Sequence, residues 1–337
     1  MEKVLITGIT GMVGSHLADY IFANTDWEIH GLIRWRSSLD NLSQLVPHAN
    51  YSHRLHLSYG DIRDYSSIDN ILKNIKPNFV FHLAAQSFPM SSFSSPLDTF
   101  ETNINGTTIL LDAIRKNSPD SIVHVCSSSE IFGRVSAEKI PIKEDCTFHP
   151  ASPYAISKVG TDLVSRYYSE AFNLTTVTTR MFTHTGPRRG DVFAESSFAK
   201  QIALAEAGYT SPIIKVGNLK SLRTVADVRD AVRAYYLALT VNPIKGSYYN
   251  IGGSNTLTID EILKYLISLS KIKNKLKVEI DPSRLRPIDA DLQIPDTTKF
   301  TKHTGWLPEY SFEETMLDLI EYWRERVKKF GNSFLNR

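Results

Sequence analysis

The stretch VLITGITGMVG at positions 4–14 joins a short apolar run to three closely spaced glycines, Gly8, Gly11 and Gly14. Val4–Thr7 has the length and composition of a buried strand, and Val13–Phe22 follows with the apolar spacing of a helix. At such a turn the first glycine permits the tight bend, the second lets backbone approach a pyrophosphate, and the third lets helix and strand pack closely. The stretch therefore predicts a dinucleotide-binding βαβ unit with phosphate at the helix N-terminus.

The same alternation of apolar runs and helical patterns continues through the first half of the chain. It is typical of βαβ units, so we predict a doubly wound Rossmann α/β fold, with a parallel sheet that helices cover on both faces. Further strands are expected at Glu28–Ile33, His56–Tyr59, Phe79–Leu83, Ile122–Cys126 and Thr175–Arg180, and further helices at Ile68–Asn74 and Thr107–Lys116.

From about Phe182 the alternation loosens, which indicates a second, smaller C-terminal α/β lobe for the substrate. We expect the nucleotide-binding domain at 1–181 with a return segment at about 224–252, and the lobe at 182–223 and 253–330. The expected elements are helices at Ser197–Ala207, Val225–Leu239, Thr258–Leu269 and Phe312–Lys328, a strand at Ile213–Val216, and a connector at Asp281–Ile294.

The composition is that of a globular enzyme: among 337 residues, 42% are apolar and 22% charged. The net charge of +2 and the short basic clusters at 34–36 and 188–189 predict no nucleic-acid partner and no membrane-surface binding. Cys126 and Cys146 form neither a CxxC pair nor a cluster with histidine, so no metal site is expected and a reducing cytoplasm fits. Because no export signal and no apolar stretch of roughly 18 residues occurs, we expect a cytoplasmic protein.

Two arginines follow the second predicted strand, about twenty residues after Gly14, where an NAD enzyme usually has an acid for the ribose. Arg34 or Arg36 can bind a 2′-phosphate with a guanidinium fork, which favours NADP, although a solvated charged loop would look the same. Asp61, after the third strand, could accept from the adenine amino group or cap a helix.

Tyr154 and Lys158 lie four residues apart, so a helix would place phenol and ammonium on one face. A lysine there would lower the pKa of the tyrosine and could bond the nicotinamide ribose. The pair follows a predicted strand that ends in Ser128-Ser129-Glu130, and this position favours a catalytic role over an ordinary amphipathic helix.

Together, the three glycines, the serine after a central strand and the Tyr154/Lys158 pair resemble the extended short-chain dehydrogenase family over essentially the whole chain. In that family epimerases usually carry a small residue at the place of Glu130, whereas nucleotide-sugar 4,6-dehydratases carry Thr-Asp-Glu or Thr-Ser-Glu. Ser128-Ser129-Glu130 is similar to the dehydratase pattern, with serine in place of threonine. A surface or salt-bridge role for Glu130 is the competing interpretation.

The resemblance implies a mechanism in which Tyr154 takes the proton of the sugar 4-hydroxyl while hydride passes to NADP, and Ser128 bonds the same oxygen. Glu130 then removes the proton at carbon 5, water leaves carbon 6 with help from Ser129 or Glu130, and hydride returns to carbon 6. It also implies a loop over the cofactor at 82–87 and a structural Asn103. The implied cofactor contacts are Gly8, Thr10, Gly11, Met12, Val13, Gly14, Arg34, Arg36, Asp61, Ile62, Leu83, Ala84, Ala85, Tyr154, Lys158, His184 and Arg189.

The segment ending in Pro-Arg-Arg-Gly at 187–190 resembles GDP-mannose 4,6-dehydratases, except that Thr183 stands where an asparagine is usual. Arg223 and Arg286 resemble the family's two diphosphate ligands, and converging guanidinium forks suit a pyrophosphate. Each arginine alone could be a surface residue. The implied substrate contacts are Gln86, Ser87, Ser128, Glu130, Thr183, Val192, Lys200, Gly217, Asn218, Arg223, Arg286 and Asp289.

The predicted function is therefore a GDP-mannose 4,6-dehydratase type of lyase acting on a GDP-sugar, with NADP recycled internally. A manno-heptose would present the same reacting groups as mannose, so the motifs leave both sugars open. The motifs are also compatible with a 4-epimerase or 4-reductase, with a plain C4 dehydrogenase and with a non-catalytic dinucleotide sensor. Helices near Thr107–Lys116 and Tyr154–Ala171 resemble those that pair subunits in this family, which predicts a homodimer or homotetramer.

Overall fold

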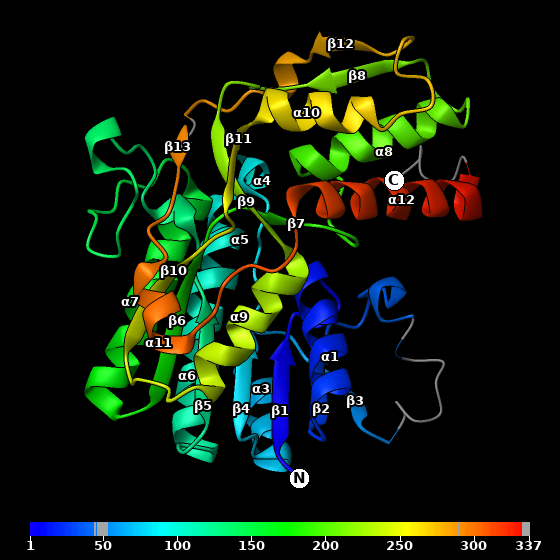
Figure 1. Cartoon of the computed structure of the whole chain (residues 1–337). Helices are drawn as coiled ribbons and strands as arrows, with labels where there is room; N and C mark the ends of the chain where they lie inside the picture. Colours follow the sequence, from blue (N-terminus) through cyan, green and yellow to red (C-terminus); the bar gives the residue numbers. More distant parts are fainter. Residues whose placement is uncertain (44, 46–52, 289, 332–337) are drawn as a thin grey trace.

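A computed structural model describes residues 1–43, 45, 53–288 and 290–331 of the chain. It has a large parallel sheet wrapped by helices and a smaller lobe beside it, toward which the arrow of β1 points in Figure 1. The fold is α/β, as the sequence predicts.

Seven parallel strands form the large sheet, in the order β10-β6-β5-β4-β1-β2-β3. Strand β1 lies inside the sheet because the chain first winds toward β3 and then crosses to the other side, as in a doubly wound fold. The strands are β1 Lys3–Thr7, β2 Glu28–Ile33, β3 Leu55–Tyr59, β4 Phe79–His82, β5 Ile122–Cys126, β6 Thr175–Met181 and β10 Ser247–Ile251.

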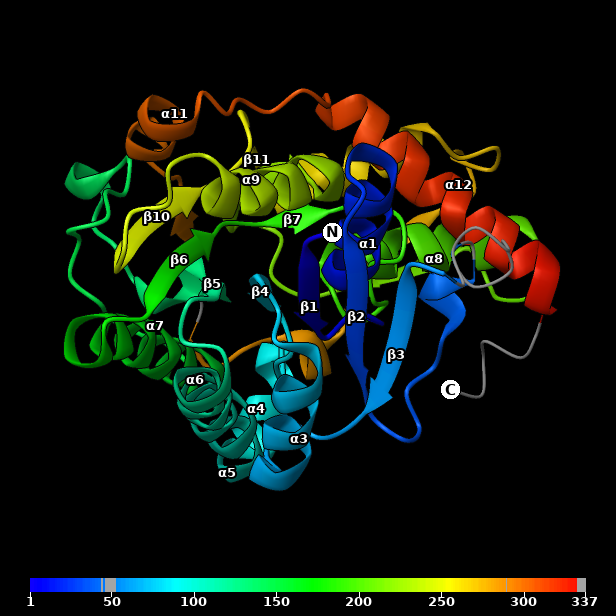
Figure 2. The same ribbon diagram turned by 90° about the horizontal axis from the view of Figure 1, so that it is seen from below.

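Helices cover both faces of this sheet, and Figure 2 shows the two layers on opposite sides of it. On one face α1 packs against α9, and their apolar side chains share a core with β1, β2 and β10. On the other face α3 packs against α6, and α6 against α7, over a second core. These helices are α1 Met12–Asn24, α9 Val228–Thr240, α3 Tyr65–Ile75, α6 Gly106–Asn117 and α7 Pro153–Phe172, with the short α4 Pro89–Ser94, α5 Pro96–Phe100 and η2 Glu101–Asn105 leading into α6.

The smaller lobe has its own core, to which α8, α10 and α12 each contribute an apolar face. Serine or threonine capping boxes begin two of these helices, at Thr258/Glu261 and Ser311/Glu314, and so satisfy their first N–H groups. The elements of the lobe are β7 His184–Thr185, α8 Ala194–Glu206, β8 Ile213–Val216, β9 Leu222–Asp227, β11 Asn255–Thr258, α10 Ile259–Ser268, β12 Lys277–Ile280, η5 Pro282–Arg284, β13 Leu292–Gln293 and α12 Phe312–Phe330.

Strand β9 connects the two halves of the molecule. It pairs with β11, β13 and β7 in a small sheet of the lobe. Successive side chains of a strand point to opposite faces, and here Val225 lies in the core of the lobe while Ala226 lies in the core beneath α1 and α9. One strand therefore contributes to both cores.

The prediction of a single helix at Val225–Leu239 is wrong at its start. The chain remains extended to Asp227, whose carboxylate then accepts a hydrogen bond of 2.7 Å from the backbone N–H of Arg229 and caps α9. Apolar spacing continues from strand into helix at this point, which hides the boundary.

A second difference concerns the predicted lobe segment 253–330. Its helix α11 Thr298–Thr304 packs against β10, and both Phe300 and Trp306 belong to the core of the large sheet. This part of the segment therefore packs with the nucleotide-binding half rather than with the lobe.

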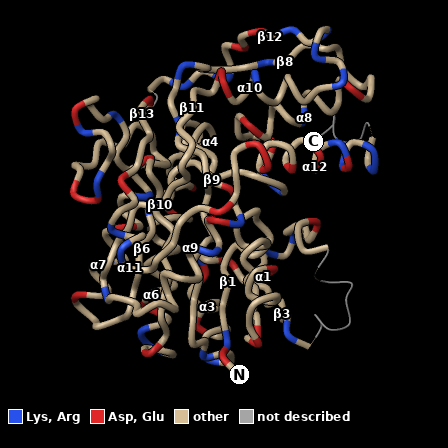
Figure 3. Tube along the Cα trace, viewed as in Figure 1, with Lys and Arg blue, Asp and Glu red and all other residues tan. Residues whose placement is uncertain are grey.

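Basic and acidic residues alternate along the tube in Figure 3, and neither sign forms a long continuous run. Within the described residues, none of the helices has both the length and the apolar character that crossing a membrane requires. The same part of the chain contains no group of three histidine, cysteine, aspartate or glutamate side chains placed to hold a metal ion.

Candidate active site

The glycine turn between β1 and α1 is packed backbone against backbone. A Cβ on Gly14 would lie 2.3 Å from the carbonyl oxygen of Gly8, and one on Gly8 would lie 2.8 Å from the backbone nitrogen of Ala84. Gly8 also has a φ of +74°, a conformation that favours glycine. Leu83 and Ala84 donate their backbone N–H groups to the Thr7 hydroxyl, each at 3.1 Å, and hold the loop after β4 against this turn.

The N-terminus of α1 fits a phosphate group. Gly11 is its N-cap and supplies no side-chain oxygen, and the first turn, with Met12 and Val13, has no acidic residue. The first N–H groups therefore retain their positive partial charge for an external anion. Thr10 borders the turn and accepts a hydrogen bond from the Asn41 amide through its carbonyl oxygen.

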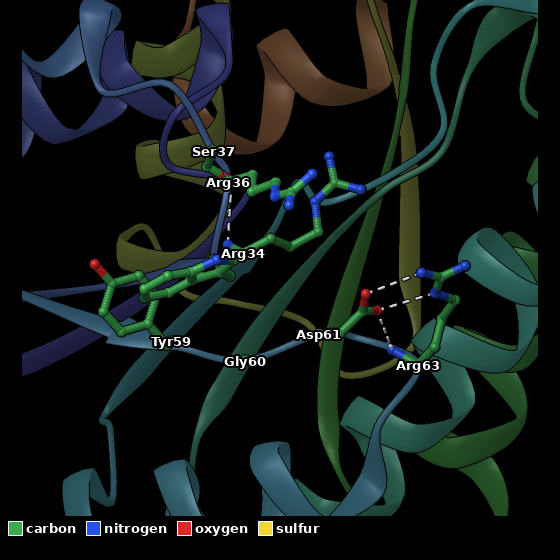
Figure 4. A pocket seen from close by; sticks show the side chains of 8 residues that line it. Arg34, Arg36, Ser37, Tyr59, Gly60, Asp61 and Arg63 are labelled. Atoms are coloured by element: carbon green, nitrogen blue, oxygen red, sulfur yellow. Dashed lines mark hydrogen bonds and ion pairs between the residues drawn. The ribbon is translucent and has the colours of Figure 1, made fainter.

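A pocket of about 660 Å³ opens at the carboxyl ends of β2 and β3. Figure 4 shows Arg34 and Arg36 directed to one side of it. No ion pair joins either arginine to a carboxylate within the described residues, so both guanidinium groups suit an added anion. The Trp35 and Tyr59 rings lie 5.7 Å apart beside them and are exposed, and such rings can stack on a base. The residues that line this pocket are Arg34, Trp35, Arg36, Ser37, Tyr59, Gly60, Asp61 and Arg63.

Asp61 lies in the pocket, but Arg63 already binds it. The carboxylate accepts from the Arg63 backbone N–H at 2.9 Å and from its guanidinium at 3.0 Å, which holds the pKa of Asp61 below its ordinary value. The competing interpretation of Asp61 as a helix cap is wrong, because Asp64 caps α3. Ile62, also predicted at the cofactor, is buried in the core beneath α3 and α6, so its side chain does not reach the pocket.

The loop after β4 places Ala85 and Gln86 near the surface, but the Gln86 side chain is held in place. Its amide donates to Ser91 Oγ at 2.6 Å and its carbonyl oxygen accepts from the Phe88 N–H at 2.6 Å. The predicted contact of Gln86 with a sugar would require breaking this network, whereas Ser87 is exposed. Asn103 is buried and bonds both backbone groups of Gln86, in agreement with its predicted structural role.

Helix α7 holds Tyr154 and Lys158 at one end of the sheet. Ser152 caps the helix by accepting from the Ala155 N–H at 3.0 Å, and Pro153 occupies its first turn. Both predicted side chains are nearly buried, with 8% of Tyr154 and 5% of Lys158 exposed. The Lys158 ammonium donates to the Cys126 carbonyl oxygen at 2.7 Å, at the end of β5.

Burial dominates the pKa of Tyr154, so the predicted effect of Lys158 on this pKa stays a prediction. Burial raises the pKa of the Tyr154 phenol well above its ordinary value, and the opposing influences are a hydrogen bond with Ser128 and the charge of Arg189. Burial also lowers the pKa of Lys158, which weakens its ability to stabilise a phenolate. Arg189, which was not predicted for this role, is one cation that lowers the pKa of Tyr154.

Arg189 and His184 approach the same place from the lobe side. The Arg189 guanidinium lies 3.5 Å from the centre of the Phe193 ring, and its Nε is buried with no hydrogen-bond partner in the described part of the chain. Burial lowers the pKa of Arg189, and it lowers that of His184 to about 4, so His184 is neutral at pH 7. A buried guanidinium with an unused donor suits an anionic or carbonyl group of a bound molecule.

The serines and glutamate after β5 form a tight turn, η3 Ser129–Ile131. Ser128 begins it by accepting from the Glu130 N–H at 3.2 Å, and both serines are buried. The charge of Glu130 contributes to the raised pKa of Tyr154, as expected for groups close in space. Ser128, Glu130, Tyr154 and Arg189 therefore share one site.

A second arginine reaches this site. The Arg286 guanidinium lies 3.7 Å from a carboxylate oxygen of Glu130, and 24% and 17% of the two side chains are exposed. Arg223, the other predicted diphosphate ligand, instead donates to two backbone carbonyls, those of Leu222 at 3.0 Å and Ala290 at 2.6 Å. Arg286 thus lies at the site, whereas Arg223 braces the connector on which Arg286 lies.

The remaining predicted substrate residues are spread over the lobe. Lys200 is paired with Asp191 at 2.6 Å, Asn218 bonds Ser221 within its own turn, and Val192 is largely exposed. A Cβ on Gly217 would lie 2.7 Å from the Arg284 carbonyl oxygen, so this glycine permits close packing of two loops. Thr183 bonds β9 through its carbonyl oxygen. Asp289 lies outside the described residues.

Comparison with known proteins identifies the family. The family model for GDP-mannose 4,6 dehydratase matches residues 5–319 of the chain. The chain belongs to this family. A GDP-mannose 4,6 dehydratase of Arabidopsis thaliana is 32% identical over 334 residues, which cover 96% of this chain and 90% of that protein.

Solved structures of related enzymes share the fold of this family member. The structure of RMD from Pseudomonas aeruginosa complexed with NADPH is 26% identical, covers 97% of this chain and all of the other, and gives a TM-score of 0.81. DesIV, a dTDP-glucose 4,6-dehydratase from Streptomyces venezuelae with NAD and TYD bound, is 25% identical, covers 98% and 99%, and gives 0.84. Both of these related structures contain a nicotinamide dinucleotide.

Sequence reasoning about this GDP-mannose 4,6-dehydratase family member missed five residues that line the pocket, Trp35, Ser37, Tyr59, Gly60 and Arg63. A signal existed for Tyr59, because it is the last residue of β3 and ligands bind beyond the carboxyl ends of parallel strands. Trp35 stands between the two predicted arginines. The sequence indicates Arg63 only through its position two residues after Asp61, which allows the two side chains to pair across a turn.

Proposed function

We propose that this protein removes water from GDP-mannose and forms the 4-keto-6-deoxy sugar, with NADP as its bound cofactor. The observation that carries the proposal is the location of Glu130, a carboxylate at the same site as Ser128 and Tyr154. A base is needed to remove the proton at carbon 5, and a 4-epimerase or a plain C4 dehydrogenase has no step for such a base.

The side chains of the site divide the work. Tyr154 takes the proton of the 4-hydroxyl, and Ser128 bonds the same oxygen. Arg189 assists because its charge offsets part of the burial that raises the pKa of Tyr154. Glu130 takes the proton of carbon 5, and Ser129 or protonated Glu130 assists the departing water. When bound, the nicotinamide ring supplies reversible hydride acceptance, so that oxidation at carbon 4 balances reduction at carbon 6.

NADP rather than NAD is supported by Arg34 and Arg36. Their guanidinium groups border the pocket just after β2, where an NAD enzyme usually has an acidic residue for the ribose. A 2′-phosphate would give both groups an anionic partner. The exposed rings of Trp35 and Tyr59 offer apolar surface for the adenine.

Mannose and a manno-heptose stay open as the sugar, since both present the same reacting groups to Tyr154 and Glu130. Pairing of subunits through α6 and α7 also stays a prediction, supported by four apolar side chains exposed on α7, Ile156, Leu163, Tyr167 and Phe172. A cytoplasmic location likewise stays a prediction.

The test is incubation with GDP-mannose, or with a GDP-manno-heptose, followed by mass spectrometry of the nucleotide sugar and absorbance of NADPH. We expect a product lighter by one water at constant NADPH. A product of unchanged mass, or a product that has lost hydrogen while NADPH accumulates, would contradict the proposal. Glu130→Gln should stop water loss and keep cofactor binding, while Glu138→Gln, an exposed acid in the same loop, is the matched control.

A further inference from the structure

The pair of Arg286 with Glu130 joins two groups that the proposed reaction needs separately. Their charged atoms lie 3.7 Å apart, and both side chains are mostly buried. The attraction between the two charges favours an orientation of the Glu130 side chain toward Arg286 rather than toward a bound sugar. The pair therefore opposes the movement of Glu130 toward a substrate proton.

Arg286 differs from its neighbours in the connector. From Pro282 to Leu285, and at Pro287 and Ile288, the chain is exposed, and only Arg286 within 282–288 turns partly inward. Residues 282–288 thus present one partly buried cation to the site from an otherwise exposed segment.

The connector is fixed on both sides of Arg286. Before it, Asp281 caps η5 by accepting from the Ser283 N–H at 3.0 Å. After it, Ile142 pairs with the chain at 294–296 through backbone bonds of 2.7 Å and 2.8 Å, and Ile142 belongs to the loop that follows Glu130. Arg223 adds its bond of 2.6 Å to Ala290. Because the backbone is tied on both sides, a change of partner at Arg286 involves its side chain.

We propose that Arg286 is a positioning residue that holds Glu130 in an ion pair until the diphosphate of the substrate takes the guanidinium away. This deepens the proposed function and rests on it. A diphosphate has more negative charge than one carboxylate and accepts guanidinium forks, so it competes for the same cation. The base is released only when the nucleotide sugar is seated, which couples recognition of the diphosphate to proton removal.

The proposal predicts a thermodynamic coupling that does not depend on turnover. GDP contains the diphosphate but no sugar, and its binding to wild-type protein must break the pair. Glu130→Gln removes the competing charge, so GDP should bind about two- to fivefold tighter, the range for a partly exposed ion pair. Arg286→Gln should weaken GDP binding, and adding Glu130→Gln to Arg286→Gln should bring no further gain.

Isothermal titration with GDP of the wild type, both single variants and the double variant tests this coupling. Glu138→Gln removes a carboxylate from the same loop and controls for a general effect of charge on an anionic ligand. A gain in Glu130→Gln alone, lost in the double variant, supports the proposal. Equal affinities of Glu130→Gln and wild type overturn it, as does a similar gain in Glu138→Gln or in the double variant relative to Arg286→Gln.

These outcomes are distinct from failure of the proposed function. If wild-type protein releases water from GDP-mannose but the affinities show no coupling, the dehydratase stands and the role of Arg286 falls. If no water is lost although GDP binds with the predicted coupling, the proposed reaction falls while the exchange of partners at Arg286 stands. If GDP does not bind to the wild type, nothing would displace Arg286, and the positioning role is excluded.

Discussion

Replacing Asp162 by asparagine should reveal how strongly the helix of the active site is anchored. Asp162 lies on α7, two turns after Tyr154, and accepts from Arg180 Nε at 2.8 Å and from its terminal nitrogen at 3.1 Å. Neither side chain is more than 1% exposed. Breaking a buried pair by removing one partner costs about 3–5 kcal/mol, because the other charge stays buried without compensation.

The surroundings of Arg180 place the cost at the lower end of that range. Arg180 also donates to the Glu144 carbonyl oxygen at 2.6 Å, and its guanidinium lies 4.4 Å from the centre of the Tyr248 ring. These contacts persist in Asp162→Asn, so we expect a loss of about 3 kcal/mol in the free energy of unfolding. Activity per folded molecule should fall as well, because Arg180 connects α7 to the loop that follows Glu130.

Urea unfolding followed by tryptophan fluorescence measures the first effect. Asp260→Asn is the matched control, because it breaks an exposed pair with Lys264 of similar length, 2.7 Å, and should cost below about 1 kcal/mol. If Asp162→Asn lowered the free energy of unfolding no more than Asp260→Asn does, the argument that burial makes the Asp162–Arg180 pair more stabilising would be refuted.

Three further predictions concern the cofactor site and the response to pH. Gly14→Ala should abolish dinucleotide binding in a fluorescence titration with NADPH, because the new Cβ would lie 2.3 Å from the Gly8 carbonyl oxygen; tight binding by the folded variant would contradict this. Arg34→Gln should weaken NADP binding by about tenfold and leave NAD binding nearly unchanged, and equal losses would count against a 2′-phosphate contact. Burial lowers the pKa of His82 and of His124 to about 3, below the 6.5 of an unfolded histidine. Since the unfolded chain binds these protons first, the free energy of unfolding should fall between pH 6.5 and about 4, by up to about 1.4 kcal/mol per pH unit for each histidine; a flat urea midpoint over that range would oppose this.

Much of the fold could be predicted because it depends on local patterns. The glycine turn after β1 identifies a Rossmann unit, since a Cβ at any of the three glycines would lie unusually close to neighbouring backbone atoms. The small sheet of the lobe could not be predicted, because β7 and β13 have two residues each and exist only through pairing with β9. The capping role of Asp227 was a usable signal for the start of α9, and apolar periodicity concealed it.

For the site, the sequence predicts which side chains meet better than it predicts what each one does. Ser128 and Glu130 follow β5, and Tyr154 lies on α7, which connects β5 to β6. The three side chains share one site, as this order along the chain predicts. The state of Tyr154 depends on burial and on Arg189, and the pairing of Arg286 with Glu130 depends on how the connector crosses the site. Both are properties of tertiary packing that no spacing along the chain contains.

Strand β9 contributes side chains to both hydrophobic cores, and this affects how the whole molecule unfolds. Val225 and Ala226 are adjacent in the chain, yet each is embedded in a different core. Melting either core would pull this strand out of register and expose apolar surface in the other. We therefore expect both halves to unfold in one cooperative transition, seen as a single peak in differential scanning calorimetry.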